Sequence, residues 1–329
     1  MLFNLRRDLG AHGDTGAAAT LEAEYDTAET VEAVLGAVRA AGHQAVAVEI
    51  NGGCMQELAR ARPDLAFNLA EGIAAEGREA QAPAVCDILG IPYTGSRVLT
   101  LALCLDKAMT KRVLRQEAIP TAAFTVVAPG ESARAEGLRF PLFVKPVGEG
   151  SSMGVSPASL ISEPEGLEPQ VQAVHRTYGE PALVEEFLTG REFTVGILGN
   201  DRPQILPVTE IDYAEVPPGY PAVYSYQFKK EWDADRFYPC PAEVDPDLGA
   251  RLEDLALRTY RAVRCLDVGR VDLRLDGAGV PHVLEINPLP GLAPGFSDLP
   301  RQAARAGMSY DLLVARILEH AMRRHGLLS

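Results

Sequence analysis

The stretch that most constrains the fold of this chain runs from Gly269 to Gly291 and reads GRVDLRLDGAGVPHVLEINPLPG. Apolar and polar residues alternate on both sides of a glycine-rich turn, a pattern that predicts two short antiparallel strands. The expected apolar faces comprise Val271, Leu273 and Leu275 on the first strand and Leu284 and Ile286 on the second. If both faces pack against one core, the polar side chains of the two strands share the opposite face of the hairpin.

On that opposite face, Asp272 is expected to lie across from Glu285, and Arg270 near Asn287. Carboxylate and amide oxygens are ligands that hard cations prefer, and Mg²⁺ is typically held by one or two carboxylates together with substrate phosphates. An ordinary hairpin with a solvated polar face is the simpler interpretation, and the hairpin taken alone favours it. The rest of the chain decides between the two.

The composition limits the class of protein. A chain of 329 residues is long enough for two or three domains, and a net charge of −14 argues against a nucleic acid as partner. The five cysteines are scattered without a CxxC pair, which indicates buried, reduced thiols in a cytoplasmic protein. No apolar run reaches about 18 residues and no signal peptide is recognisable, so we expect no membrane association.

The order of apolar segments predicts three domains. Residues 1–104 alternate strand-like runs at 2–5, 45–50 and 65–69 with helical patterns, which favours a parallel α/β domain. In sheets of this kind, ligands bind beyond the carboxyl ends of the strands, where the turn at 68–72 is expected.

The rest of the chain predicts two domains that mix helices and strands. In the second domain, residues 105–190, strands are expected at 124–127, 142–145, 153–155 and 183–187, with one helix near 165–178. In the third, residues 191–329, we expect strands at 192–198, 205–211 and 237–240, the hairpin, and helices at 248–263, 298–306 and 309–324. The loop at 212–235 is long enough to be functional or mobile.

A Gly-Ser loop follows the strand that ends at Lys145, in the sequence PLFVKPVGEGSSMG. Glycines allow the backbone to approach a phosphate closely, and backbone N–H groups and serine hydroxyls can donate to it. A flexible surface loop is the alternative interpretation. The lysine that ends the preceding strand favours a phosphate site.

The segment LVEEFLTGREF places hydrogen-bond acceptors at a strand end and its connector. Adenine needs one or two hydrogen bonds in an apolar slot, and ribose hydroxyls need a carboxylate. Glu185, Phe187, Leu188 and Glu192 could supply these groups. In isolation, an amphipathic strand with solvated glutamates is the better interpretation.

Taken in order, the segments LDKAMTK, FVKPVGEGSSMGVS, VEEFLTGREFTVGILG, GRVDLRLD and VLEINPLPG resemble the ATP-grasp ligases, and most closely the D-alanine–D-alanine ligases. The resemblance covers about residues 65–329. It implies an ATP-grasp fold, of mixed α/β and α+β type, with an N-terminal Rossmann-like parallel α/β domain. It also implies a homodimer that uses ATP and two Mg²⁺ ions, for which Mn²⁺ can substitute, to act on small molecules.

The resemblance also implies roles for individual residues. Lys107 and Lys145 would hold the ATP phosphates, and a loop would close over them, formed by Glu149, Gly150, Ser151, Ser152 and Met153. Adenine and ribose would be framed by Glu185, Glu186, Phe187, Leu188 and Glu192. The metal ligands would be Asp272, Glu285 and Asn287, and the catalytic residues would be Lys229, Arg270, Ser151 and the backbone N–H of Gly291.

These residue types suit a carboxylate–amine ligase. A carboxylate is a poor electrophile until transfer of the γ-phosphoryl group gives an acyl phosphate, which requires cations around the phosphoryl oxygens. An amine then displaces the phosphate through a tetrahedral intermediate, whose oxyanion needs a fixed donor such as Arg270. A mobile loop would keep water from the activated intermediate.

The substrate side departs from the D-alanine–D-alanine ligase pattern. The N-terminal Gly-Gly-x-Ser-x-Glu loop is absent, and Glu22, Glu24 and Asp26 are only candidates to replace its glutamate. Glu71 stands where the family has histidine, Lys230 stands in place of tyrosine, and Phe296 followed by Ser297 stands where the family has serine. We therefore expect a ligase whose substrate need not be D-alanine.

Three alternatives remain at this point. The first is a true D-alanine–D-alanine ligase of cell-wall synthesis with an atypical N-terminus. The second is an ATP-binding regulatory protein without ligase activity, against which the retained polar residues of the hairpin argue. The third is a kinase that releases a phosphorylated product.

Overall fold

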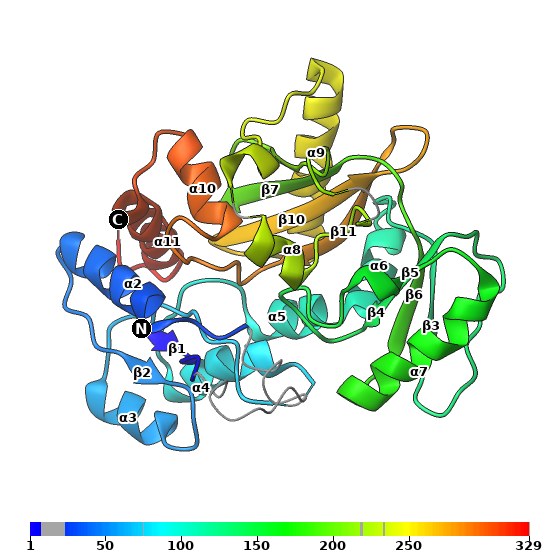
Figure 1. Ribbon diagram of the computed structural model, residues 1–329. Coiled ribbons are helices and arrows are strands. Elements are labelled where there is room, and N and C mark those ends of the chain that lie inside the picture. The colour runs from blue at the N-terminus through cyan, green and yellow to red at the C-terminus, as the bar shows by residue number, and fades with distance from the viewer. Residues whose placement is uncertain (8–23, 75, 218–219, 233, 329) are drawn as a thin grey trace.

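The computed structural model describes residues 1–7, 24–74, 76–217, 220–232 and 234–328, apart from the side chains of Tyr226 and Lys230. Within these ranges the strands form three sheets, and Figure 1 shows the C-terminal sheet lying above the other two groups of elements. The arrangement brings segments from all parts of the chain to the centre of the molecule.

The N-terminal region contains short parallel pairings surrounded by helices. Strand β1 (Leu2–Phe3) pairs with β2 (Val48–Glu49), and single parallel bridges join Leu2 to Asn68 and Ala66 to Tyr93. The helices are α2 (Ala28–Ala40), α3 (Cys54–Ala61), the 3₁₀ turn η3 (Arg78–Ala80), α4 (Gln81–Leu89) and α5 (Val98–Leu105). The predicted parallel alternation is present, but the strand expected at 45–50 shortens to two residues and residues 65–69 form only bridges.

The second sheet is antiparallel and has the order β3-β6-β4-β5. Its strands are β3 (Phe124–Val127), β4 (Leu142–Pro146), β5 (Leu160–Ile161) and β6 (Ala182–Glu186). Helix α6 (Lys107–Gln116) precedes the sheet, α7 (Leu167–Tyr178) packs on it, and η4 (Pro157–Ser159) and η5 (Pro164–Gly166) are 3₁₀ turns. The strand expected at 153–155 is wrong, because Ser151 and Ser152 are left-handed, with φ of 47° and 61°, and turn the chain there.

The third sheet has the order β11-β10-β7-β8, with β9 also paired to β7. Its strands are β7 (Glu192–Leu198), β8 (Gln204–Ile205), β9 (Thr209–Ile211), β10 (Val268–Leu275) and β11 (Pro281–Asn287). Figure 1 shows α9 (Pro246–Ala262) against this sheet, and α10 (Asp298–Arg305) and α11 (Tyr310–Arg324) complete the chain beside α2. The long loop carries α8 (Tyr226–Glu231) and the 3₁₀ turn η6 (Asp235–Phe237), so the strand expected at 237–240 is wrong.

The hairpin forms with the predicted register, in which Asp272 pairs with Glu285 and Arg270 with Asn287. A β-bulge after Asp272 shifts the pairing, so that Leu273 lies opposite Val283. Val283 and Ile286 therefore enter the core, and Leu284 lies on the other face, contrary to the expected alternation. Bulges commonly redirect side chains next to active sites.

No helix in the described part of the chain is both long enough and apolar enough to cross a membrane.

Candidate active site

Two adjoining cavities lie beside the polar face of the hairpin, and four residues line both of them: Ser152, Tyr224, Lys229 and Glu285. The first cavity lies between the second and third sheets. The second extends toward the N-terminal region and the start of α10. A group bound in one cavity can therefore reach a molecule bound in the other.

The first cavity brings together most of the residues predicted to bind ATP. It is lined by Lys107, Lys145, Glu149, Ser152, Met153, Glu185, Glu186, Phe187, Leu188 and Glu192. Gly150 and Ser151 line the second cavity instead. Segments separated by more than 80 residues thus meet around one space, as the motif order predicts.

A buried charge cluster positions Lys145 at this cavity. The Glu185 carboxylate lies 2.8 Å from Lys145 Nζ and 2.7 Å from Lys111 Nζ, and all three residues are buried. Burial alone would raise the pKa of Glu185, but the two ammonium groups lower it to about 2. Lys111 was not among the predicted site residues, because its place in a helical pattern carries no sign of this contact.

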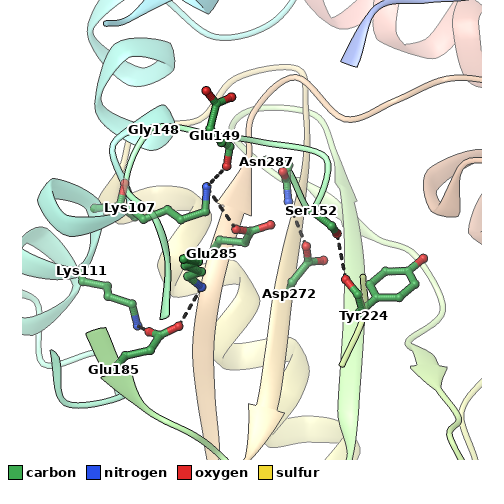
Figure 2. Close-up of polar contacts among 12 residues, drawn as sticks. Lys107, Lys111, Gly148, Glu149, Ser152, Glu185, Tyr224, Asp272, Glu285 and Asn287 are labelled. Carbon is green, nitrogen blue, oxygen red and sulfur yellow. Dashed lines mark hydrogen bonds and ion pairs between the residues drawn. The ribbon is translucent and has the colours of Figure 1, made fainter. Parts of the chain in front are cut away.

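Lys107 approaches the hairpin from the first turn of α6. Its Nζ donates to the backbone oxygen of Glu149 and lies 3.8 Å from Glu285 Oε2 (Figure 2). It therefore links the Gly-Ser loop to the polar face of β11.

An aromatic and charged wall closes the other side of the first cavity. The rings of Phe143 and Phe187 stack with centroids 5.9 Å apart, and the Arg274 guanidinium lies 4.5 Å from the Phe187 ring. Arg274 and the Tyr213 hydroxyl donate to Glu192 at 2.7 Å and 2.8 Å. Glu192 is thus held in place, whereas the Glu186 carboxylate pairs with Arg139 at the exposed surface.

Asp272 lies at the centre of the polar face of the hairpin. Arg270 donates to both of its carboxylate oxygens, at 2.9 Å and 2.8 Å, and Thr194 and Asn287 donate at 2.7 Å and 3.0 Å. Burial opposes ionisation, but the adjacent guanidinium lowers the pKa of Asp272 below its usual value. Asp272 and Asn287 point toward each other in Figure 2, and Glu285 lies beside them on β11.

The Gly-Ser loop and the long loop meet over the boundary between the cavities. Ser152 Oγ donates to the Tyr224 backbone oxygen at 2.8 Å (Figure 2), and Lys229 Nζ lies 4.4 Å from the centroid of the Tyr224 ring. Burial, together with the charge of Arg270, lowers the pKa of Lys229. The two loops therefore cover the boundary between the cavities, and the Lys229 ammonium group lies beneath them.

The second cavity collects the predicted catalytic and substrate residues. It is lined by Ser151, Lys229, Arg270, Gly291, Ser297 and Glu71, together with the candidates Glu24 and Asp26. A Cβ at Gly291 would lie 2.9 Å from Ser297 Oγ, so a side chain there would displace the Ser297 hydroxyl. Lys230 lies in α8 but its side chain is outside the described atoms, as is the whole of Glu22.

Among the described residues, three charged residues of the second cavity or its wall were not predicted. Arg78, in η3, pairs with Glu24 at 2.7 Å and with Glu149 at 3.1 Å, which joins the N-terminal segment to the Gly-Ser loop. Glu79 and Asp298 line the cavity itself. No sequence spacing marks them, because each depends on contacts between distant segments.

The comparisons with known proteins decide the family. A family model described as the D-ala D-ala ligase C-terminus matches residues 113–319. The chain belongs to the D-alanine–D-alanine ligase family. A curated D-alanine–D-alanine ligase from Chelativorans sp. is 35% identical over 290 residues, which is 87% of this chain and 89% of the relative. One from Bordetella avium is 38% identical over 248 residues, 74% of each chain.

Other matches extend this result. The uncharacterized protein y4sG of Sinorhizobium fredii is 36% identical over 302 residues, covering 89% of this chain and 88% of that protein. The crystal structure of D-alanine–D-alanine ligase from Bacillus anthracis complexed with ATP matches with a TM-score of 0.73 at 24% identity, over 91% of this chain and 94% of that chain. The structural match confirms the ATP-grasp fold. By family the chain is an ADP-forming carboxylate–amine ligase, as the sequence predicts.

Proposed function

We propose that this member of the D-alanine–D-alanine ligase family uses ATP to activate a small carboxylate and joins it to an amine, on a substrate other than D-alanine. The observation that carries the proposal is the continuity of the two cavities through Lys229 and Glu285. A phosphoryl group from the first cavity would meet a carboxylate in the second between these two side chains.

In the first cavity, Lys107 and Lys145 would hold the ATP phosphates under the loop at 149–153. The adenine would pack against the apolar wall formed by the stacked rings of Phe143 and Phe187, with acceptors from the strand that carries Glu185. Glu192, already oriented by Arg274 and Tyr213, would bind the ribose hydroxyls.

The polar face of the hairpin has a donor set that fits two Mg²⁺ ions, with Mn²⁺ as a substitute. Asp272, Glu285 and the amide oxygen of Asn287 would be the protein ligands. Among the described residues no group of three or more His, Cys, Asp and Glu side chains is arranged for a metal ion. Two carboxylates and one amide would leave coordination positions for phosphate oxygens and water, as is usual for Mg²⁺. When bound, the ions would neutralise charge on the phosphates.

The remaining steps use residues of this chain. Lys229 would attract the γ-phosphoryl group as a carboxylate oxygen of the substrate attacks phosphorus and ADP departs. The amine would then attack the carbonyl carbon, while Arg270 and the N–H of Gly291 stabilise the oxyanion. Phosphate would leave, and the amine would lose a proton to give the amide. The contact from Ser152 to Tyr224 would exclude water, with Ser151 beside the substrate.

The substrate would differ from D-alanine because Glu71, Lys230 and Phe296 stand where the family has histidine, tyrosine and serine, with Ser297 one residue further along. Ser297 Oγ already accepts a hydrogen bond from Ala293 N–H at 3.1 Å. One hydrogen-bonding position of the Ser297 hydroxyl is therefore occupied before any substrate binds. We further propose that the domains comprise residues 1–104, 105–190 and 191–329. The chain would form a homodimer and would not bind nucleic acid, given its net charge of −14.

Replacing Lys145 is expected to weaken ATP binding. A Lys145→Met substitution removes a charge that faces the first cavity, and ATP affinity should fall by about 1.5–3 kcal/mol, the range for a charge-assisted hydrogen bond. Titration calorimetry with ATP and Mg²⁺ measures the effect. Lys111→Met is the matched control, because Lys111 contacts the same Glu185 but does not line the cavity. Equal losses in both variants would contradict the assignment of Lys145 to phosphate.

The function itself is tested by ADP release over pairs of amino acids and amines, both enantiomers included, with mass detection of the product. We expect weak ADP release with D-alanine alone and stronger release with at least one other pair. Hydroxylamine should trap the acyl phosphate as a hydroxamate, which a kinase product would not give. Robust D-alanyl-D-alanine formation at low millimolar D-alanine would favour the D-alanine–D-alanine ligase alternative. ATP binding without turnover on any pair would favour the regulatory one.

A further inference from the structure

Three carboxylates line the part of the second cavity that the N-terminal region forms: Asp26, Glu71 and Glu79. Their backbones are tied together. The Asn4 carbonyl accepts from Asp26 N–H at 3.0 Å, and the Asn4 side-chain oxygen accepts from Gly72 N–H at 2.8 Å. The three carboxylates therefore belong to a fixed part of the fold.

Close packing at Gly72 brings the third carboxylate to the same place. Gly72 has φ of 83°, and a Cβ there would lie 2.1 Å from the backbone oxygen of Arg78. The Tyr25 hydroxyl also donates to the Gly72 carbonyl, at 2.9 Å. The turn that follows Glu71 is thus held between residue 25 and the 3₁₀ turn that carries Glu79.

None of the three carboxylates forms an ion pair with a described residue, and the positive charges of Arg78 and Lys107 act on Glu79 only through longer-range attraction. Arg78 pairs with Glu24 and Glu149, whereas Asp26, Glu71 and Glu79 make no side-chain hydrogen bond or ion pair with any described residue. Glu79 is only 9% exposed and lines the cavity. An unpaired buried carboxylate is costly, and a cationic ligand would remove that cost.

The opposite end of the cavity carries cationic side chains beside carboxylates, because Arg270 there is paired with Asp272 and Asp298. Lys229 and Arg270 lie beside Glu285, where the first cavity begins. A substrate carboxylate is attracted to this end, and its ammonium group can offset one carboxylate at the other. Two carboxylates then remain without a counter-ion. An amino acid with a neutral side chain therefore leaves an excess of negative charge at that end of the cavity.

We propose that the substrate of the second cavity carries a second ammonium group, as a diamino acid does, and that Asp26, Glu71 and Glu79 hold it. This inference rests on the proposed function for the identity of the cavity as the substrate site. It adds a class of substrate, an amino acid with two ammonium groups and a net charge of +1 at neutral pH, and names the residues that select it.

The acid–base properties of the cluster support this assignment. Burial raises the pKa of Asp26 to about 7, and burial together with the charge of Glu24 raises the pKa of Glu79 to about 8. Burial and the neighbouring carboxylates also raise the pKa of Glu71 well above its usual value. A bound ammonium group favours the ionised carboxylates and would reverse these shifts.

The test is direct binding, measured by calorimetry on the full chain with Mg²⁺ and a non-hydrolysable ATP analogue. The ligands are 2,4-diaminobutyrate and norvaline, in both enantiomers, which differ by an ammonium group in place of a methyl group. We expect one enantiomer of the diamino acid to bind at least about tenfold more tightly than the matching norvaline, the effect of one charge-assisted contact. Equal affinities would overturn the inference without any variant being needed.

Substitutions then locate the contact. Glu71→Gln and Glu79→Gln should each weaken diaminobutyrate binding by about tenfold more than they weaken norvaline binding. Asp254→Asn, on the exposed face of α9, is the control and should change neither. Loss of affinity for both ligands alike would contradict selection of the second ammonium. If diaminobutyrate binds preferentially but no pair releases ADP, the inference stands and the proposed ligase function fails.

Discussion

Glu285→Gln is expected to lower ADP formation by about 10³-fold, equivalent to about 4 kcal/mol of transition-state stabilisation. The glutamine keeps the shape of the side chain but removes the charge of the one carboxylate that lines both cavities. That charge would hold the metal ions at the point where the γ-phosphoryl group is transferred. Single-turnover ADP formation at saturating ATP and Mg²⁺ measures the loss.

The loss must come from the site and not from the fold. Asp276→Asn is the matched control, because it removes the same charge from the turn of the same hairpin, where Asp276 accepts from Ala278 and Val280 N–H groups. It should keep ADP formation within about threefold of the unmodified protein, as expected for an exposed site that contacts no ligand. Near-normal turnover in Glu285→Gln with an unchanged melting temperature would rule out the metal role of the hairpin.

The hairpin was the part of the site best predicted from sequence. Its register follows from matching two alternating patterns, and the pairing of Asp272 with Glu285 came out as expected. The bulge at Leu284 could not be predicted in this way, because an inserted residue leaves the local alternation looking regular. Strand β3 was equally local and equally well predicted. The strand predicted at 153–155 is absent because the left-handed backbone of Ser151 and Ser152 turns the chain just before Met153.

The less predictable part of the site is the acidic end of the second cavity. Glu24, Glu71 and Glu79 come from three segments that no periodic pattern connects, and Arg78 joins one of them to the Gly-Ser loop. Such contacts depend on how the N-terminal region packs against the rest of the chain. Sequence reasoning could mark Glu71 only as a departure from the family pattern. Its neighbours became visible only through the packing around Gly72.

Arg270→Lys is expected to slow amide formation by about 10²–10³-fold, the usual cost of losing an oxyanion donor. Lysine keeps the positive charge but lacks the planar guanidinium group. In Arg270 this group donates to both carboxylate oxygens of Asp272 and faces the second cavity. Since the oxyanion develops only after the acyl phosphate has formed, the first chemical step should be affected much less. Rapid quenching can separate the two steps, because ADP reports the first and the amide the second.

The effect of Arg270 must be separated from that of its partner Asp272. Arg270→Lys also disturbs Asp272, which could slow phosphoryl transfer indirectly. Thr194→Val removes another hydrogen bond to Asp272, of 2.7 Å, and leaves Arg270 in place. If Arg270 acts on the tetrahedral intermediate, its variant should keep a rapid burst of ADP and form the amide slowly, whereas Thr194→Val should change both steps by the same modest factor. A burst that falls in parallel with amide formation in Arg270→Lys would instead assign the guanidinium to phosphoryl transfer, leaving the N–H of Gly291 as the proposed oxyanion donor.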